Sequence, residues 1–359
     1  MDTHIAIKFI SEEDIVKSGC LNIDDVISII ENAMLAYKSG KVMLPDKISQ
    51  IFDKKNQSRI NCMPATLFNE KVCGVKWVSV FPTNPSKFNV QNVSGLIVLS
   101  EIETGFPFAV MEGTIITALR TACMGAIAAK YLAKKNSHVY GTIGTGEQAK
   151  AHFIVMKHTF PEIDVCYVAS RREKSEENFI NIMREKYPDV KFISCHGDYD
   201  MAAKNADIIV TAVSCQKPLL RAEAIKKGAY YCHVGGWEDE YSVPTKASKI
   251  VCDNWEALKH RGSPTIARMY KDGLLADKDI YADLPDLINK LKPGRENDEE
   301  FTYFNAIGLA YVDVAVAYHF YRKVEEVKMG RKLTLQEKDV IDCFFEGMDN
   351  AAKINMIRG

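Results

Sequence analysis

The sequence predicts an α/β protein in which a doubly wound parallel-sheet domain is inserted into a discontinuous α+β domain. At 359 residues the chain exceeds the usual size of one domain, so two are expected. Short β-branched runs alternate with helical patterns in the middle of the chain, whereas the first 120 residues hold consecutive strand-like runs. The chain becomes helical again after about residue 301, which suggests that its two ends complete one domain.

In the middle of the chain, the alternation of strands and helices indicates βαβ units on a parallel sheet. Apolar residues fill the strand-like runs, as burial on both faces of a doubly wound sheet requires. The expected strands cover 138–144, 163–170, 190–194, 206–213, 229–236 and 248–254, and the expected helices cover 147–161, 173–188 and 197–206.

The segments on either side of this middle region have a different pattern of predicted strands and helices. Consecutive strands without intervening helices indicate an antiparallel or mixed sheet. A helix is expected over 22–40, strands over 47–52, 58–64, 72–82, 95–101 and 107–113, and further helices over 114–133 and 308–327. The predicted domains are therefore residues 1–120 plus 320–359, and an inserted domain at 121–319.

Composition excludes several classes of partner. The chain has 46 lysines and arginines against 47 acidic residues, so it lacks the basic excess that nucleic acid requires. Its start is acidic where a signal peptide is basic and apolar, and no run reaches the length of a membrane span. Histidines and cysteines do not cluster at metal-ligand spacing. We therefore expect a cytoplasmic protein without nucleic-acid, membrane or metal partners.

A glycine turn follows the first strand of the middle segment. Residues 143–149 read IGTGEQA, with Gly144 and Gly146 in the first two places of a G-x-G-x-x-G/A dinucleotide turn and Ala149 in the third. The helix that follows points its first amides and its dipole at bound phosphates. The strand before and the helix after favour a Rossmann NAD(P) site over a glycine turn without a ligand.

The end of the second strand bears on the choice of cofactor. No carboxylate stands at Ala169 or Ser170, and Arg171 and Arg172 follow at once. An acid at this place binds the ribose hydroxyl of NAD, whereas arginine suits a 2′-phosphate. The pattern favours NADP(H) over NAD(H); the alternative is a solvated arginine pair at a helix start.

Two cationic residues outside this domain are candidates for the substrate site. Lys76 lies inside a strand, where alternation places it opposite Val75 and Trp77, and a lysine there meets an anion unless it lies on the sheet surface. Arg120 lies in a small, apolar helix and suits a bidentate grip on a carboxylate or an internal salt bridge.

An acidic loop is the third candidate. Glu238, Asp239 and Glu240 follow a strand at the edge of the sheet where doubly wound folds bind ligands. Such a loop is usually only solvated, but its position makes one of these acids a candidate to bind an amine or position water.

The chain resembles the ornithine cyclodeaminase/mu-crystallin family almost from end to end. The ordered motifs that carry the resemblance are NCMPATL, GVKWVSVFP, ETGFPFAVMEG, TALRTACMGAIAAKYLA, IGTGEQA, VGG and FNAIGLAYVDVAVAYHFY. The resemblance implies a homodimer formed through the discontinuous domain, which also binds substrate. It implies substrate contacts at Lys47, Met63, Lys76, Asn92 and Arg120. The expected cofactor contacts are Arg120, Thr121, Gly144, Thr145, Gly146, Glu147, Gln148, Ser170, Arg171, Arg172, Ala212, Val213, Ser214 and Gly235.

Two departures from the cyclodeaminases count against ornithine cyclisation. Lys47 stands where they carry an arginine, and Trp237 and Glu238 follow the glycine pair where they carry an aspartate. Within the family, segments such as NPSKFNVQNVSGLIVL and KIVCDNWEALKHRG resemble the branch of N-(2-amino-2-carboxyethyl)-L-glutamate dehydrogenase, a siderophore-biosynthesis enzyme. Glu238 aligns with the aspartate of that branch. Enzymes of that branch use NAD, whereas Arg171 and Arg172 favour NADP(H).

Together these observations predict an NAD(P)-dependent oxidoreductase that acts on the C–N bond of an amino acid or N-(carboxyalkyl)amino acid through an imine. Lys76, Glu238 and Asp239 are the expected catalytic residues. Three alternatives stay open: a redox-neutral ornithine cyclodeaminase with bound NAD, an amino-acid dehydrogenase or cyclic imine reductase, and a non-enzymatic NADPH-dependent ligand-binding protein.

Overall fold

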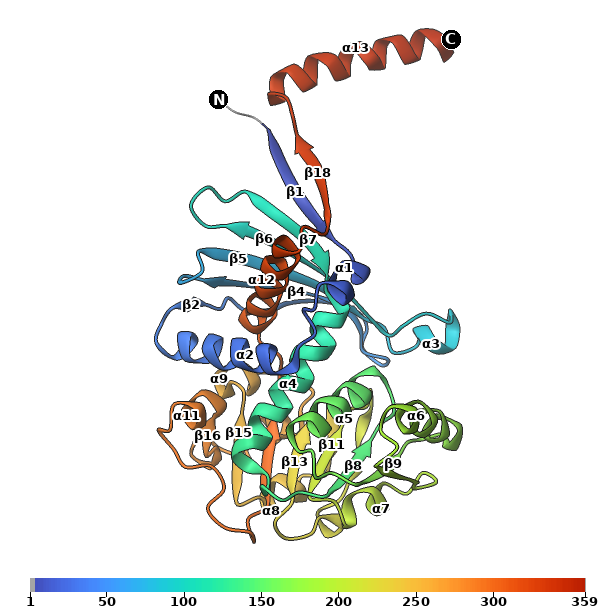
Figure 1. Cartoon of the computed structure of the whole chain (residues 1–359), viewed down its shortest axis with the longest axis vertical. Helices are drawn as coiled ribbons and strands as arrows, with labels where there is room; N and C mark the ends of the chain where they lie inside the picture. Colours follow the sequence, from blue (N-terminus) through green and yellow to red (C-terminus); the bar gives the residue numbers. More distant parts are fainter. Residues whose placement is uncertain (1–3, 359) are drawn as a thin grey trace.

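The computed structural model describes residues 4–358, with 354–358 described as backbone only. Two sheets of eight strands each dominate it, one above the other in Figure 1. The N-terminal and C-terminal segments build the upper sheet, and the middle of the chain builds the lower one. The α/β fold class predicted from the sequence is confirmed.

The lower sheet is entirely parallel, with strand order β10-β9-β8-β11-β13-β17-β15-β16. All six predicted strands are present. The sequence reading missed β16 and β17, and β17 lies between β13 and β15 although it follows β13 by about seventy residues and β15 by about fifty. The bounds are β8 (Val139–Ile143), β9 (Val165–Ala169), β10 (Lys191–Ser194), β11 (Ile208–Thr211), β13 (Tyr230–His233), β15 (Lys249–Cys252), β16 (Ala282–Asp283) and β17 (Thr302–Asn305).

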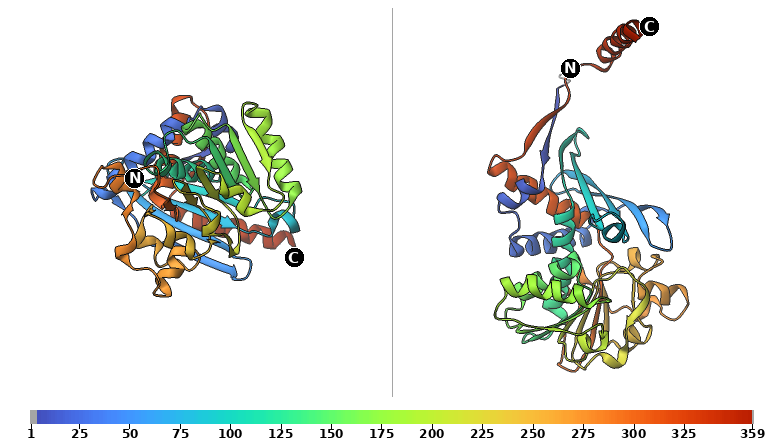
Figure 2. Two further views of the ribbon diagram at one scale, coloured as in Figure 1. Left: turned by 90° about the horizontal axis from the view of Figure 1, so that it is seen from below. Right: turned by 90° about the vertical axis from the view of Figure 1, so that its right-hand side faces the viewer.

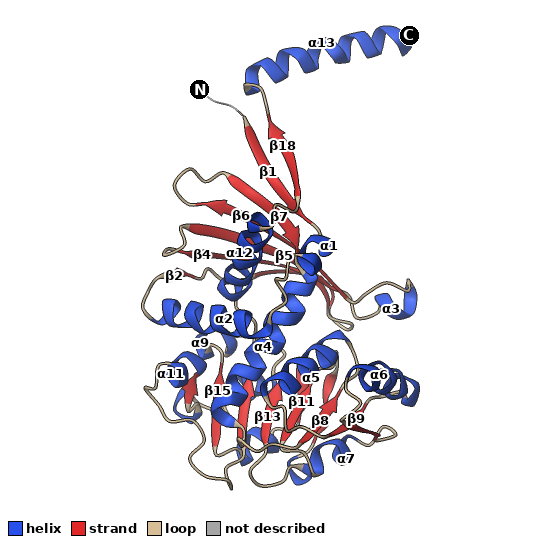
Figure 3. Cartoon of the chain, in the orientation of Figure 1, coloured by secondary structure: helices blue, strands red, loops and turns tan. Residues whose placement is uncertain are grey.

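Helices cover both faces of this sheet, as Figure 3 shows, so its strands are almost wholly buried. The chain runs outward from β8 through β9 to β10 and then returns to β11 on the other side of β8, which makes the carboxyl ends of β8 and β11 the topological switch point. The helices are α5 (Glu147–Thr159), α6 (Glu173–Lys186), α7 (Tyr199–Lys204), α8 (Ser242–Lys246), α9 (Trp255–Leu258), α10 (Thr265–Lys271) and α11 (Leu284–Ile288), and a small separate sheet pairs β12 (Gln216–Leu220) with β14 (Trp237–Asp239).

The upper sheet is mixed. Its order is β18-β1-β7-β6-β5-β4-β2, with β3 also paired to β4, and only β1 and β7 run parallel. The sequence reading missed β1, β2 and β18. The bounds are β1 (Ile5–Ile10), β2 (Val42–Met43), β3 (Ile48–Asp53), β4 (Ser58–Leu67), β5 (Val72–Val80), β6 (Val93–Glu101), β7 (Pro107–Glu112) and β18 (Arg331–Gln336).

One face of the upper sheet packs on helices. Helix α12 (Ala310–Glu326) lies against β4, β5 and β6, next to α2 (Ile23–Lys38). Helix α4 (Thr114–Leu132) contacts α2 and α12 above and α5, β13 and β17 below, so it belongs to both domains. It is long and apolar enough to cross a membrane, but most of it is buried inside the protein. The division at residues 120 and 320 remains a proposal, and the packing of α12 favours a last segment that begins near Ala310.

The C-terminal segment extends away from the body. Strand β18 pairs with β1, and α13 (Val340–Arg358) continues beyond it, as Figure 1 and the right-hand view of Figure 2 show. Two short helices, α1 (Glu12–Lys17) and α3 (Asn84–Lys87), complete the chain. Large apolar side chains of α13 are more than half exposed: Val340, Ile341, Phe344, Phe345 and Met348.

Candidate active site

The glycine turn lies at the switch point of the lower sheet. Gly144 has φ +116°, and a Cβ there would lie 2.5 Å from the carbonyl oxygen of Ala212 at the end of β11. Gly146 caps α5 without a side-chain hydrogen bond, and open space faces its Cα. Ala149 is fully buried, so its methyl group fits the packing of helix on strand. The turn therefore has the close approach and the free helix amides that a pyrophosphate requires.

Four other predicted cofactor residues belong to the glycine turn, to the start of α5 or to α4. Thr145 and Gln148 are half-buried, and Glu147 is exposed beside its ion-pair partner Lys150. Thr121 donates its hydroxyl hydrogen to the carbonyl of Thr117, one turn earlier on α4.

The end of β9 carries no carboxylate that faces outward. Glu176 is fully buried, and one of its oxygens accepts the amide hydrogen of Ser170 at 2.7 Å. Arg171 and Arg172 are exposed, and neither forms an ion pair within residues 4–353. Two free cations thus stand where the ribose of a dinucleotide is bound.

Glu238 is engaged inside the protein. Its side chain is fully buried and accepts hydrogen bonds from the amides of Val213 at 2.7 Å and Gly235 at 2.8 Å, and from the hydroxyl of Thr211 at 2.6 Å. The carboxylate therefore ties the turn after β11 to the turn after β13. It positions two predicted cofactor residues and does not point into open space.

Asp239 is also fully buried. It accepts a hydrogen bond from the hydroxyl of Thr265 at 2.6 Å, and its Oδ1 lies 3.3 Å from Nε2 of His233. Burial raises the pKa of Asp239 to about 6, although His233 lowers it. Glu240 is half-buried and lies near the hydroxyl of Ser242. Both side chains are fully buried, as is that of Lys76, so the catalytic role predicted for Glu238 and Asp239 stays a prediction.

A buried ion triad lies on the helix-covered face of the upper sheet. Lys76 on β5 donates to Oδ1 of Asp313 on α12 at 2.6 Å, and Nε of Arg120 on α4 donates to the same oxygen at 2.8 Å. Lys76 is 1% exposed and Asp313 is 0% exposed, while the other oxygen of Asp313 has no hydrogen-bond partner among the residues that the structure describes. Desolvation, and then repulsion from Arg120, lower the pKa of Lys76 to about 8 against the pull of Asp313.

Lys47 and Met63 flank this triad. Met63 pairs with Lys76 across β4 and β5, and Lys47 lies one residue before Ile48, which pairs with Cys62. Lys47 is half-buried, and its pKa is lowered to about 7 by desolvation and by nearby cations. The structure thus brings Lys47, Met63, Lys76 and Arg120 together, as predicted for substrate contacts.

Asn92 links the two domains. Its Nδ2 lies 3.5 Å from the hydroxyl of Ser214, which follows β11. This predicted substrate residue of the upper domain therefore lies next to the carboxyl end of β11 in the lower sheet.

Sequence reasoning missed three charged residues of this region. Asp313 interrupts an apolar helix just as Lys76 interrupts an apolar strand, so the same argument could have found it. Asp253 is buried and accepts hydrogen bonds from the amides of Ile307 and Gly308, next to Arg120. Arg261 lies in a loop after α9, where no local pattern marks it.

Comparison with known proteins agrees with this geometry. The sequence model of the ornithine cyclodeaminase/mu-crystallin family matches residues 9–328. An N-((2S)-2-amino-2-carboxyethyl)-L-glutamate dehydrogenase of Staphylococcus aureus is 28% identical over 331 residues, which cover 91% of this chain and 98% of that protein. The structure of a Δ(1)-pyrroline-2-carboxylate reductase of Thermococcus litoralis with NADH and L-proline is similar with a TM-score of 0.84 and 29% identity, covering 90% of this chain and 99% of its own. An archaeal alanine dehydrogenase dimer with bound NAD gives a TM-score of 0.83 and 32% identity, covering 92% and 100%.

Proposed function

The chain belongs to the ornithine cyclodeaminase/mu-crystallin family, and from this premise we propose that it transfers a hydride at the C–N carbon of an amino acid or N-(carboxyalkyl)amino acid, with an imine as the oxidised form. Its relatives are NAD(P)-dependent oxidoreductases of amino acids and imines, and this chain is an enzyme of that class. The buried triad of Lys76, Asp313 and Arg120 carries the finer proposal, because two cations share one carboxylate there and can accept a second one from substrate.

The residues of the triad would hold and orient the substrate. Lys76 and Arg120 bind its α-carboxylate, and this fixes the direction of the Cα–H bond, the positioning that supplies much of such catalysis. Because its pKa is lowered to about 8, Lys76 can also exchange a proton with the substrate nitrogen near neutral pH. The nicotinamide ring, when bound, supplies or accepts the hydride.

Glu238 and Asp239 take a different role in this proposal from the one expected. Glu238 holds the turns that follow β11 and β13, and both acids are fully buried. We assign Glu238 as a positioning residue for the cofactor turns. Its loss is expected to raise the KM for the cofactor more than it lowers kcat.

For the cofactor, the free arginine pair after β9 supports a preference for NADP(H). Arg171 and Arg172 are exposed, Glu173 is paired with His196, and the carboxylate of Glu176 is buried and accepts the amide hydrogen of Ser170. The solved relatives bind NADH and NAD, which supports the opposite preference. The ratio of kcat/KM for NADPH to that for NADH decides between the two.

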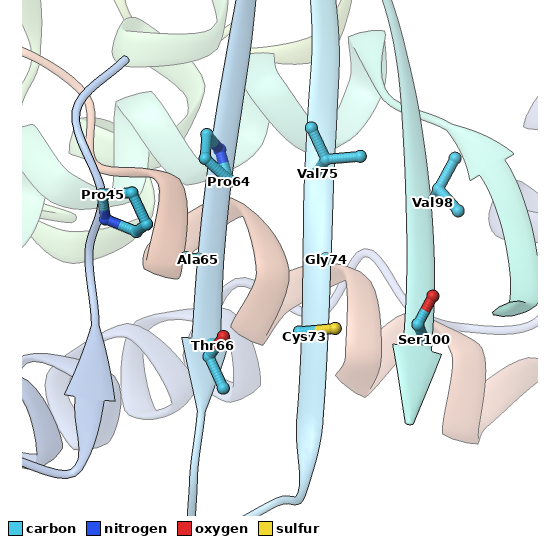
Figure 4. A pocket seen from close by; sticks show the side chains of 9 residues that line it. All are labelled: Pro45, Pro64, Ala65, Thr66, Cys73, Gly74, Val75, Val98 and Ser100. Atoms are coloured by element: carbon cyan, nitrogen blue, oxygen red, sulfur yellow. The ribbon is translucent and has the colours of Figure 1, made fainter. Parts of the chain in front are cut away.

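The outer face of the upper sheet supports a homodimer. Figure 4 shows a hollow on the face turned away from α12, with a volume of about 220 Å³. Apolar side chains of β4, β5 and β6 line it, among them Pro64, Val75 and Val98. Trp77 is 44% exposed on the same face. Contiguous apolar surface of this kind marks protein interfaces, and we propose that a second copy covers it in the cytosol.

A substrate panel tests the proposed reaction. Purified protein is assayed with amino acids, with pairs of an amino acid and a 2-oxo acid, and with cyclic imines, each with NADH and NADPH or their oxidised forms. Stoichiometric change in nicotinamide absorbance supports hydride transfer to or from substrate. Turnover of ornithine without net change would instead identify a redox-neutral cyclodeaminase. Ligand binding without any turnover would identify a binding protein.

A further inference from the structure

A short loop connects the lower sheet to the helix that carries Asp313. Strand β17 ends at Asn305, the loop covers residues 306–309, and α12 begins at Ala310 with Asp313 in its first turn. The loop starts beside the end of β15, because Asn305 pairs with Cys252 across the two parallel strands. It therefore passes from the edge of the cofactor domain straight into the helix that packs on the upper sheet.

Asp253 holds this loop from the end of β15. Its side chain is buried, and one of its oxygens accepts the amide hydrogens of Ile307 at 2.9 Å and Gly308 at 3.0 Å. The other oxygen accepts the amide hydrogen of Asn254 at 2.9 Å. Hydrogen bonds to an ionised carboxylate are strong, so these three fix the backbone that donates them.

Gly308 faces the guanidinium group of Arg120. Its φ is +81°, and a Cβ at this position would lie 3.1 Å from one terminal nitrogen of Arg120 and 3.2 Å from the other, which are the two nearest atoms. A carboxylate oxygen accepts hydrogen bonds from nitrogen at such distances. Because glycine has no side chain, the position in front of the two nitrogens is left open. Nε of Arg120 is bound to Asp313, which fixes the orientation of the guanidinium group.

We propose that Asp253 is a positioning residue of the α-carboxylate site. It holds the 306–309 loop so that the open position at Gly308 stays in front of Arg120, and an oxygen of the substrate carboxylate occupies this position. The inference rests on the proposed function, in which Lys76 and Arg120 bind the α-carboxylate. Asp253 itself acts only through the loop and does not touch the substrate.

Asparagine at position 253 keeps the size of the side chain but has only one acceptor oxygen. Its NH2 group must then face either the amide of Asn254 or the amides of Ile307 and Gly308. Donors that face each other repel, so the backbone at Gly308 shifts relative to Arg120. The substitution is nearly isosteric, and the strand that carries it keeps its backbone hydrogen bonds.

Calorimetric titration of butyrate, an inert carboxylate, into the protein with bound cofactor tests the proposal. Asp253→Asn should weaken butyrate binding about tenfold and change the affinity for the cofactor less than about twofold, since hydrogen bonds to charged groups are lost only at the carboxylate site. Asp283→Asn is the matched control: Asp283 ends the neighbouring strand β16 and accepts the amide hydrogen of Trp255, outside the 306–309 loop. It should leave both affinities unchanged. An unchanged butyrate affinity in Asp253→Asn, or equal losses for butyrate and cofactor, would overturn the proposal.

Gly308→Ala tests the same contact without altering Asp253. The added methyl group fills the open position, so butyrate binding should weaken about tenfold or more. In the double variant the two losses should combine to less than their product, because residues that act through one contact are not additive. Losses that multiply would show that Asp253 acts elsewhere. Wild-type protein that binds no butyrate would refute the proposed α-carboxylate site and this inference with it, whereas binding that neither substitution weakens would refute this inference alone.

Discussion

Replacing Asp313 by asparagine removes the only carboxylate that Lys76 and Arg120 contact within the described chain. The two cations lie 2.6 and 2.8 Å from one of its oxygens, and all three side chains are buried. At an effective dielectric constant of about 20, unit charges 2.6 Å apart attract by about 6 kcal/mol before desolvation is subtracted. Removing one partner of a buried ion pair costs about 3–5 kcal/mol of stability, because the other charge stays buried and unpaired. We expect a loss in this range for Asp313→Asn at pH 6.

The loss should depend on pH in a defined direction. The pKa of Lys76 in the folded protein is already lowered to about 8, and removal of Asp313 lowers it further. A lysine with a depressed folded pKa makes the protein more stable as pH rises, because the unfolded chain binds more protons. This gain begins at lower pH in the variant than in the wild type. The difference in unfolding free energy should therefore shrink by up to about 1.4 kcal/mol per pH unit between pH 6 and pH 8, and then stay constant.

Urea unfolding of the wild type and Asp313→Asn at several pH values between about 6 and 9 measures both quantities. Asp349→Asn, at an exposed acid of α13, serves as the matched control and should change the unfolding free energy by less than about 0.5 kcal/mol. A loss below about 1 kcal/mol for Asp313→Asn, or a loss that does not change with pH, would show that the triad does not hold two charged residues.

Three further outcomes are expected. Affinity for butyrate, a simple carboxylate, should weaken as pH rises from about 6 to about 9, because Lys47 (pKa about 7) and Lys76 (pKa about 8) lose their charge, and a flat titration profile would contradict this. Arg171→Gln should reduce kcat/KM for NADPH about tenfold relative to NADH, and an unchanged ratio would remove the support for NADP(H). Gly144→Ala should abolish cofactor binding and cost more than about 2 kcal/mol, since its φ is +116° and a Cβ would meet backbone at 2.5 Å; Gly347→Ala, with open space around it, is the control for both calorimetry and unfolding.

The local patterns predicted the fold well where each element depends on its own residues. Short apolar, β-branched runs marked β8, β9 and β11, and the glycines marked the turn into α5. Lys76 was singled out because a lysine between apolar neighbours needs an anion, and the structure supplies Asp313. The insertion of β17 between β13 and β15 could not be predicted, because strand order depends on contacts between distant parts of the chain.

The acidic loop shows the limit of reasoning from position. Glu238 was expected at the ligand edge because it follows a strand and a glycine pair, and it does lie near the cofactor turns. Its carboxylate nevertheless points inward and accepts hydrogen bonds from the amides of Val213 and Gly235. This orientation could not be predicted, because it depends on how the two turns pack against each other. Arg261 could not be singled out from the sequence. A loop arginine is ordinarily solvated, and the sequence does not show which residues of the other domain lie near it.

Helix α4 runs without a break from the upper sheet to the Rossmann domain, and Arg120 lies near its middle. A continuous helix of 19 residues is stiff, so Arg120, the proposed anchor for the α-carboxylate, and Thr121, a proposed cofactor contact, belong to one rigid element. Under the proposed function, this helix would set the distance between the substrate carboxylate and the nicotinamide, and that distance would not vary with the angle between the domains. Substrate range would then change through residues that lie off this helix, such as Lys47, without altering the position of hydride transfer.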